Sequence, residues 1–157
     1  MTDRTIAGGR GVHATARRQL ADGGKDGPAP DDQRAVRVLV VDDSPVFRRG
    51  MARAVQSHVG LELVGEADCG AAALDAIAQL APDVVLMDLR MPDLDGFAVL
   101  ERLRETDPPP SCRVLIVSAS LDEEIERAAA MAGAAGCIGK ELPRADICAA
   151  ALRLARQ

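Results

Sequence analysis

Five short aliphatic runs alternate along the chain with segments of helical periodicity, and no other feature restricts the possible fold as strongly. The aliphatic runs, of which the last is minimal, occupy residues 36–41, 61–64, 84–87, 114–117 and 136–139. They are followed by segments in which apolar residues recur at helical spacing, at 46–55, 70–80, 97–106, 122–132 and 144–156. Continuous apolar strands joined by helices predict an α/β fold: one five-stranded parallel sheet with helices on both faces.

The length and composition allow one domain of this kind. A chain of 157 residues has room for one ordinary domain, and 48% of its residues are apolar. The only aromatic residues are two Phe, so the core must be built from aliphatic side chains and Met. Residues 1–34 are rich in Gly, Asp, Arg and Ala without periodicity, so we expect a disordered leader there and the folded domain at 35–157.

Composition also argues against several classes of function. A formal net charge of −5 and the scarcity of aromatic rings disfavour a DNA-binding surface or a module that stacks nucleic-acid bases. The four cysteines form no C-x-x-C pair and support neither a zinc site nor a disulfide framework. No apolar run approaches the roughly 20 residues of a membrane span and no signal peptide is evident, so we expect a cytoplasmic protein.

Polar residues stand at the carboxyl ends of four predicted strands. In a parallel sheet these ends meet at one edge, which is where ligands bind in open α/β folds. The residues at these positions are Asp42 and Asp43, Asp88, Ser118 and Lys140. Each residue alone is more often a helix cap or a solvated side chain, but their joint occurrence favours a site of three carboxylates, a hydroxyl and an ammonium.

Three clustered carboxylates repel one another unless a cation lies among them. Oxygen ligands without His or Cys favour a hard metal ion such as Mg²⁺. A metal ion and a lysine together can offset the charge of a phosphoryl group, and an Asp can be the nucleophile that accepts it. Asp88, at the end of the central strand, is the best candidate for that nucleophile. We interpret Asp93 and Asp95 as turn residues, with Gly96 supplying a backbone conformation that other residues disfavour.

Four sequence segments resemble the receiver domain of bacterial response regulators. They are Val-Val-Asp-Asp-Ser at 40–44, Asp-Val-Val-Leu-Met-Asp-Leu-Arg-Met-Pro-Asp-Leu-Asp-Gly at 83–96, Val-Ser-Ala at 117–119 and Gly-Ala-Ala-Gly-Cys-Ile-Gly-Lys at 133–140. Each segment alone is a weak signal, but their order and spacing are specific, and the resemblance extends from about residue 36 to 155. It implies a receiver fold and a role in a two-component phosphorelay.

The resemblance implies a Mg²⁺ site. Asp43 and Asp88 would bind the ion directly, the backbone carbonyl of Arg90 would be a further ligand, and Asp42 would act through water. It also implies that Asp88 takes a phosphoryl group from the phosphohistidine of a sensor histidine kinase or of a phosphotransfer protein. Such a protein is a phosphorylated switch with slow autodephosphorylation rather than an enzyme.

The same resemblance assigns the residues that would respond to the phosphoryl group. Ser118 matches the hydroxyl residue that moves to a phosphoryl oxygen, and Lys140 matches the lysine that contacts it. Cys137 occupies the switch position, where the family usually has an aromatic residue, so coupling through that position is expected to be weakened or replaced.

The segment at 133–140 and Glu141 are similar to the NarL/FixJ-type branch, whose members usually continue into a helix-turn-helix domain. The chain ends at Gln157, directly after the last predicted helix. We therefore expect no direct DNA binding from this chain, which would be either a stand-alone receiver or a truncated NarL/FixJ-type transcriptional regulator.

The sequence is compatible with further interpretations. Cys137 supports a phosphate-independent interaction module that kept the fold. A haloacid-dehalogenase-type phosphatase is disfavoured because Asp42 and Asp43 are adjacent, whereas that chemistry needs Asp-x-Asp. A homodimer is also possible. Four apolar residues of the last predicted helix could form its contact, although packing in the core explains most of them: Ile147, Ala150, Ala151 and Leu154.

Overall fold

The computed structural model describes residues 33–157, in which five strands alternate with five helices. The strands are β1 (Val36–Val41), β2 (Leu61–Ala67), β3 (Val84–Asp88), β4 (Arg113–Ser118) and β5 (Gly136–Gly139). The helices are α1 (Pro45–Ser57), α2 (Gly70–Leu80), α3 (Gly96–Glu105), α4 (Glu123–Ala132) and α5 (Arg144–Ala155). The predicted alternation is confirmed, unit by unit.

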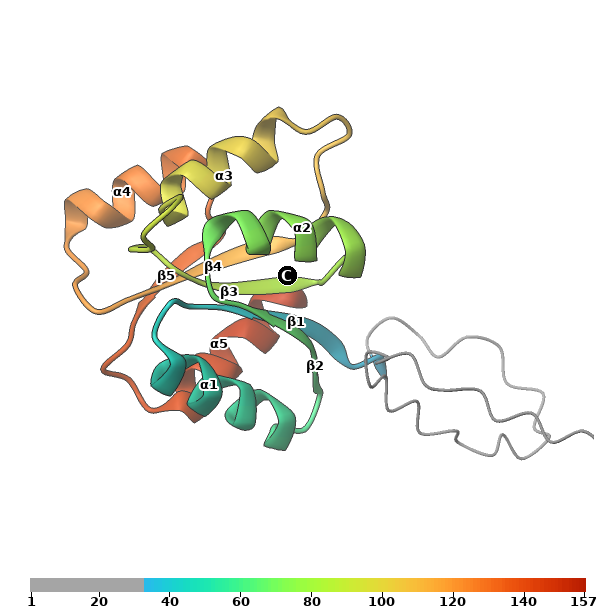
Figure 1. Ribbon diagram of the computed structural model, residues 1–157. Coiled ribbons are helices and arrows are strands. Elements are labelled where there is room, and N and C mark those ends of the chain that lie inside the picture. The colour runs from blue at the N-terminus through green and yellow to red at the C-terminus, as the bar shows by residue number, and fades with distance from the viewer. Residues whose placement is uncertain (1–32) are drawn as a thin grey trace, which may run out of the picture.

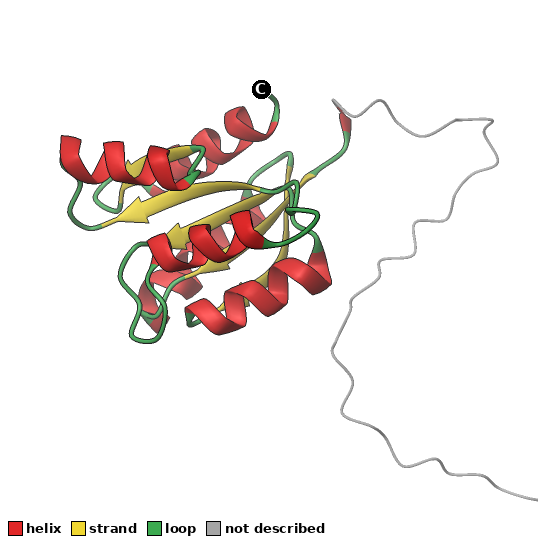
Figure 2. Cartoon of the chain, turned by 90° about the horizontal axis from the view of Figure 1, so that it is seen from above, coloured by secondary structure: helices red, strands yellow, loops and turns green. Residues whose placement is uncertain are grey.

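All five strands are parallel and form one sheet in the order β2-β1-β3-β4-β5. Helices α1 and α5 cover one face, and α2, α3 and α4 cover the other (Figure 1). Seen from above, the strand arrows run toward a common edge of the sheet (Figure 2). The predicted α/β class with helices on both faces is therefore confirmed.

Alternation of side chains along the strands divides the core into two layers. Val38 and Val40 point into the layer that packs against α1 and α5, whereas Leu39 and Val41 point into the layer that packs against α2, α3 and α4. All four side chains are at most 1% exposed. Because full burial of such a side chain contributes about 1.5–3 kcal/mol, β1 is firmly anchored in the core next to the residues that follow it.

Strand β2 is longer than the sequence pattern predicted, since it continues from Val64 to Ala67. The sequence there contains Gly65 and Glu66, which interrupt the apolar pattern. A register shift between Val38 and Leu39 lets this segment stay paired with β1 up to Ala67. A Cβ at Gly65 would lie 2.7 Å from Cδ1 of Leu80, so the Leu80 side chain of α2 would have to shift if position 65 carried a side chain.

Further expectations concern the N-terminal leader, membrane-spanning helices and the last helix. The leader predicted at 1–34 falls outside the described residues except for its last two, of which Arg34 lies 3.2 Å from Asp83. Within residues 33–157, no helix combines the length and the apolarity needed to cross a bilayer. Core packing accounts for most of the last-helix residues considered for a dimer patch, as expected: Ile147 and Ala151 are fully buried and Leu154 is 9% exposed, whereas Ala150 is half-buried.

Candidate functional site

The sheet has its topological switch point between β1 and β3, where successive connections run to opposite faces of the sheet. Asp42 and Asp43 follow β1, and Asp88 is the last residue of β3. One carboxylate oxygen from each of the three lies within 4.8 Å of the others. Asp42 and Asp88 are buried and Asp43 is exposed, so the cluster has one side open to solvent.

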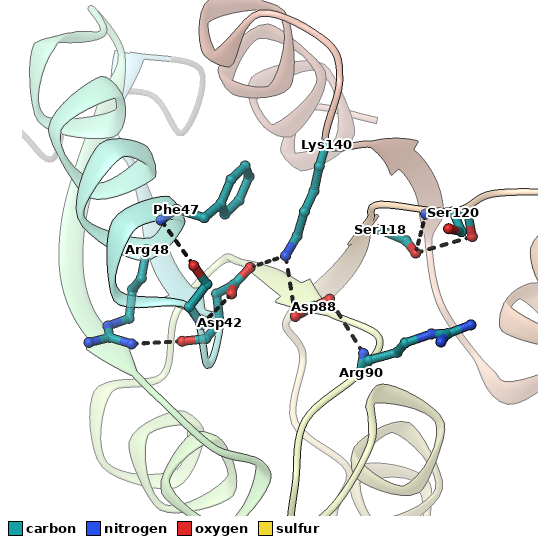
Figure 3. A network of polar contacts seen from close by, with 9 residues as sticks. Asp42, Phe47, Arg48, Asp88, Arg90, Ser118, Ser120 and Lys140 are labelled. Carbon is teal, nitrogen blue, oxygen red and sulfur yellow. Dashed lines mark hydrogen bonds and ion pairs between the residues drawn. The ribbon is translucent and has the colours of Figure 1, made fainter.

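The conformation of Asp42 is fixed by local contacts. Its Oδ1 accepts a hydrogen bond from the backbone N–H of Ser44 at 2.8 Å, and its carbonyl oxygen accepts one from Arg48 Nη1 at 2.8 Å. Its Oδ2 is fully buried and lies 2.7 Å from Nζ of Lys140 (Figure 3). The distance marks an ion pair, but among the described residues no donor meets hydrogen-bond geometry at this oxygen, which leaves it able to accept a further donor.

The surroundings of Asp88 shift the pKa of its carboxyl upward. Burial raises its pKa above the ordinary value, and the charge of Asp42 raises it further. Lys140 Nζ, 3.3 Å from Oδ2, and the backbone N–H of Arg90, 3.3 Å from Oδ1, lower the pKa but do not offset the other two effects. An additional cation beside Asp88 would therefore stabilise the ionised form of this carboxylate.

Lys140 joins the two buried carboxylates (Figure 3). Burial alone would lower the pKa of its ammonium, but the contacts with Asp42 and Asp88 outweigh burial and raise the pKa. Its Nζ also lies 4.6 Å from the centroid of the Phe47 ring, within cation–π distance. One ammonium faces three carboxylates, so the charge of the cluster and its oxygen donors suit a divalent hard cation.

Comparison with known protein families identifies the family to which this chain belongs. Residues 38–152 match the sequence model of the response regulator receiver domain. The chain belongs to the receiver domain family. It is the receiver domain of a two-component response regulator, as the motifs at the strand ends indicated.

Relatives of known structure support the same assignment. The signal receiver domain of the putative response regulator NarL from Mycobacterium tuberculosis is 42% identical, with a TM-score of 0.74 over 78% of this chain and 98% of that chain. The response regulator domain of Thermotoga maritima CheB is 32% identical, with a TM-score of 0.69 over 79% of this chain and 96% of that chain.

Curated relatives are longer than this chain. The probable transcriptional regulatory protein NarL of Mycobacterium tuberculosis is 44% identical over 121 residues, which are 77% of this chain and 55% of that protein. The protein-glutamate methylesterase/protein-glutamine glutaminase 5 of Myxococcus xanthus is 44% identical over 106 residues, 67% of this chain and 30% of that protein. Receivers of this kind thus occur in proteins with different outputs, and family membership does not assign an output.

Ser118 and Cys137 lie on the neighbouring strands β4 and β5 of the receiver. Oγ of Ser118 accepts a hydrogen bond from the backbone N–H of Ser120 and donates one to its carbonyl oxygen, each at 3.3 Å, and so is directed at Ser120 rather than at Asp88 (Figure 3). Cys137 is half-buried and borders a surface pocket of about 320 Å³, together with Glu126 and Ala130 of α4. Within residues 33–157, neither side chain makes a hydrogen bond with the three carboxylates.

Two acidic residues of the β3–α3 loop, Asp93 and Asp95, make hydrogen bonds that the sequence did not predict. Asp95 is the N-cap of α3 and accepts a hydrogen bond from the Ala98 N–H at 2.8 Å, a role that an Asp before a helix does signal. The carboxylate of Asp93 accepts hydrogen bonds from the first residues of α2, which no local pattern signals. Gly96 has no positive φ, so it does not supply the backbone conformation that the sequence led us to expect. A Cβ there would lie 3.0 Å from the Asp88 carbonyl oxygen, so close approach requires the glycine.

Proposed function

We propose that this receiver is a phosphorylation switch whose phosphoryl acceptor is Asp88. The observation that supports the proposal is the convergence of Asp42, Asp43 and Asp88 within 4.8 Å, with Lys140 in contact with two of them. The donor would be the phosphohistidine of a sensor histidine kinase or of a phosphotransfer protein. Asp88 is nearly buried, at 6% exposure, so a donor must approach from the open side formed by Asp43.

The transfer requires Asp88 to be ionised. One oxygen of its carboxylate attacks phosphorus in line, the new O–P bond forms, and the P–N bond to the donor imidazole breaks with its electron pair returning to nitrogen. Lys140 is held close to Asp88 with its proton retained, so it can neutralise charge on a phosphoryl oxygen at that position. Asp42 keeps Lys140 in place throughout, since their contact is the shorter of the two.

We assign the metal site to Asp43 and Asp88 as direct ligands of Mg²⁺, with the backbone carbonyl of Arg90 as a third ligand. The ion would supply positive charge to the phosphoryl oxygens and lower the repulsion between the carboxylates. Asp42 would act through a water molecule. Two facts favour that indirect role: its Oδ1 is occupied by the Ser44 N–H, and its buried Oδ2 can still accept a hydrogen bond.

The response to phosphorylation would begin at Ser118. Its two hydrogen bonds to Ser120 are long, at 3.3 Å, so they are weak enough to be exchanged for a charge-assisted bond to a phosphoryl oxygen. Movement of Ser118 at the end of β4 would alter the surface formed by α4, β5 and α5. Binding partners, or a second copy of the chain, would recognise that altered surface. The residues of α5 that are buried in the core, Ile147, Ala151 and Leu154, would contribute little to a contact between two copies.

The proposal treats the protein as a switch that loses its phosphoryl group slowly by hydrolysis, not as an enzyme with an external substrate. The test is Mg²⁺-dependent labelling by acetyl phosphate. Wild type should be labelled and Asp88→Asn should not. Asp122→Asn, which changes an acidic helix cap outside the cluster, should be labelled like wild type. Labelling of Asp88→Asn at the wild-type level would refute the assignment.

A second candidate function is a phosphate-independent interaction module. The observation that favours it is Cys137, a small side chain beside an open pocket at the position where the family usually has an aromatic residue. The complete cluster of carboxylates and lysine disfavours it. Burying acids that repel one another is destabilising, and a module without phosphate chemistry would gain nothing that offsets this cost.

A further inference from the structure

One carboxylate ties the β3–α3 loop to the beginning of α2. Asp93 Oδ1 accepts a hydrogen bond from the Gly70 N–H and Oδ2 accepts one from the Ala71 N–H, each at 2.9 Å. These are the first two residues of α2, whose amides have no partner within the helix. The contact joins segments 22 and 23 positions apart in the sequence.

The backbone beneath this contact is packed without space for adjustment. A Cβ at Gly70 would lie 2.5 Å from Cβ of Leu94 and 2.6 Å from its carbonyl oxygen, so Leu94 rests directly on the start of α2. At the other end of the loop, the Gly96 N–H donates to the Leu89 carbonyl at 2.7 Å. The loop is therefore fixed at both ends, with Arg90 between the two fixed points.

The charge of Asp93 strengthens the contact. Hydrogen bonds from the amides of Ala71, Leu94 and Gly70 lower the pKa of this carboxyl to about 2, so it is ionised at any physiological pH. The N-terminus of a helix also favours a negative charge, and bonds from N–H groups to a carboxylate are stronger than those to a neutral acceptor. The side chain is exposed, so it is not held by core packing, and it ties the loop to α2 through the two bonds from Gly70 and Ala71.

We propose that Asp93 is a positioning residue for the metal site: by clamping the loop to α2, it holds the Arg90 carbonyl where it can bind the ion. The inference rests on the proposed function, because it assumes that Arg90 contributes a ligand to Mg²⁺. Asp93 does not belong to the cluster of three carboxylates and would not touch the ion. It would affect the ion indirectly, by fixing the backbone of the loop three positions after Arg90.

The test compares Asp93→Asn with Asp95→Asn. Both remove one negative charge from the same exposed loop, but Asn at position 95 can still cap α3, whereas Asn at position 93 can no longer accept from both amides of α2. Mg²⁺ titrations followed by NMR at the amides of residues 42–44 and 88–91 would give the dissociation constants. Asp93→Asn should raise the constant about three- to ten-fold, and Asp95→Asn should raise it clearly less. Asp93→Glu should restore part of the affinity.

A second measurement reports the clamp itself. Amide hydrogen exchange at Gly70 and Ala71 should be faster in Asp93→Asn than in wild type or Asp95→Asn, without a matching change in the thermal midpoint. Equal dissociation constants for the two Asn variants, with wild type binding Mg²⁺, would overturn the positioning role alone. Failure of wild type to bind Mg²⁺ would overturn the proposed metal site and the positioning role together.

Discussion

Lys140 lies closer to Asp42 than to the proposed acceptor: its Nζ is 2.7 Å from Oδ2 of Asp42, and Asp88 is 3.3 Å away. Lys140 is thus held mainly by Asp42, which is not the proposed phosphoryl acceptor. A phosphoryl group on Asp88 would find the ammonium already oriented, and the lysine would need to shift little to contact it. The lysine does not fully compensate the charge of Asp88, because burial and the charge of Asp42 still raise the pKa of that carboxyl.

The first prediction is that Asp88→Asn stabilises the metal-free protein at neutral pH. Folding raises the pKa of Asp88 above its ordinary value of 3.8. Protonation of Asp88 therefore contributes to the free energy of unfolding fully below pH 3.8, and this contribution is lost as pH rises through the pKa of the folded state. The advantage of Asp88→Asn should therefore grow with pH and then level off. Urea unfolding in EDTA between about pH 4 and pH 8 measures it. A variant less stable than wild type at the upper end would contradict the expectation.

The second prediction is that Mg²⁺ raises the unfolding midpoint of the wild-type protein. Binding to the folded state alone adds about 2.7 kcal/mol at a hundred times the dissociation constant. Asp43→Asn should lose most of this gain, because Asp43 is the exposed carboxylate of the cluster, while Asp122→Asn should keep it. Thermal unfolding with MgCl₂, compared with KCl at matched ionic strength, makes the measurement. The same gain in Asp43→Asn as in wild type would show that the ion binds elsewhere.

The third prediction concerns Phe47, whose ring lies 4.6 Å from Lys140 Nζ and 5.6 Å from the guanidinium carbon of Arg144. Phe47→Leu keeps an apolar side chain in α1 but removes the ring face. A double-mutant cycle of Phe47→Leu with Lys140→Met should give a coupling free energy of about 0.5–1 kcal/mol. Additive effects of the two substitutions would mean that the ring contributes only its apolar area.

The fourth prediction is that Cys137→Phe strengthens the response to a phosphate mimic. The pocket beside Cys137 is open and about 320 Å³ in volume, so a ring there should destabilise the protein by less than the about 1–3 kcal/mol typical of an overpacked core. Solution mass and partner binding, with and without beryllium fluoride and Mg²⁺, would be compared among wild type, Cys137→Phe and Cys137→Ala. If none of the three proteins responds, the phosphate-independent module becomes the better reading.

The convergence of the site could be predicted because strand ends are set locally. An aliphatic run that stops at Asp42 or at Asp88 specifies a strand end, and parallel pairing then places the two ends at one edge. The same reasoning placed Lys140 after β5, and the register of the sheet confirms that placement. Ser44 caps α1 and Pro45 is its first residue, a combination that is encoded in the local sequence in the same way.

Contacts made by packing could not be predicted in this way. The bonds from the start of α2 to Asp93 depend on how closely that helix approaches the β3–α3 loop, which only Gly70 makes possible. The position of Phe47 over Lys140 depends on how closely α1 approaches the loop between β5 and α5. Extension of β2 to Ala67 depends on a shift in pairing with β1. In each case the determinant is a distance between segments remote in sequence, which periodicity and capping patterns do not encode.

Chemical trapping of the acyl phosphate tests the central claim most directly. The protein is incubated with acetyl phosphate and Mg²⁺, then treated with borohydride, which reduces an aspartyl phosphate to homoserine, and the modified residue is located by mass spectrometry. We predict homoserine at position 88, with none when Mg²⁺ is replaced by EDTA. Homoserine at position 42 or 43 instead, or none at position 88 under labelling conditions, would contradict the assignment of Asp88 as the phosphoryl acceptor.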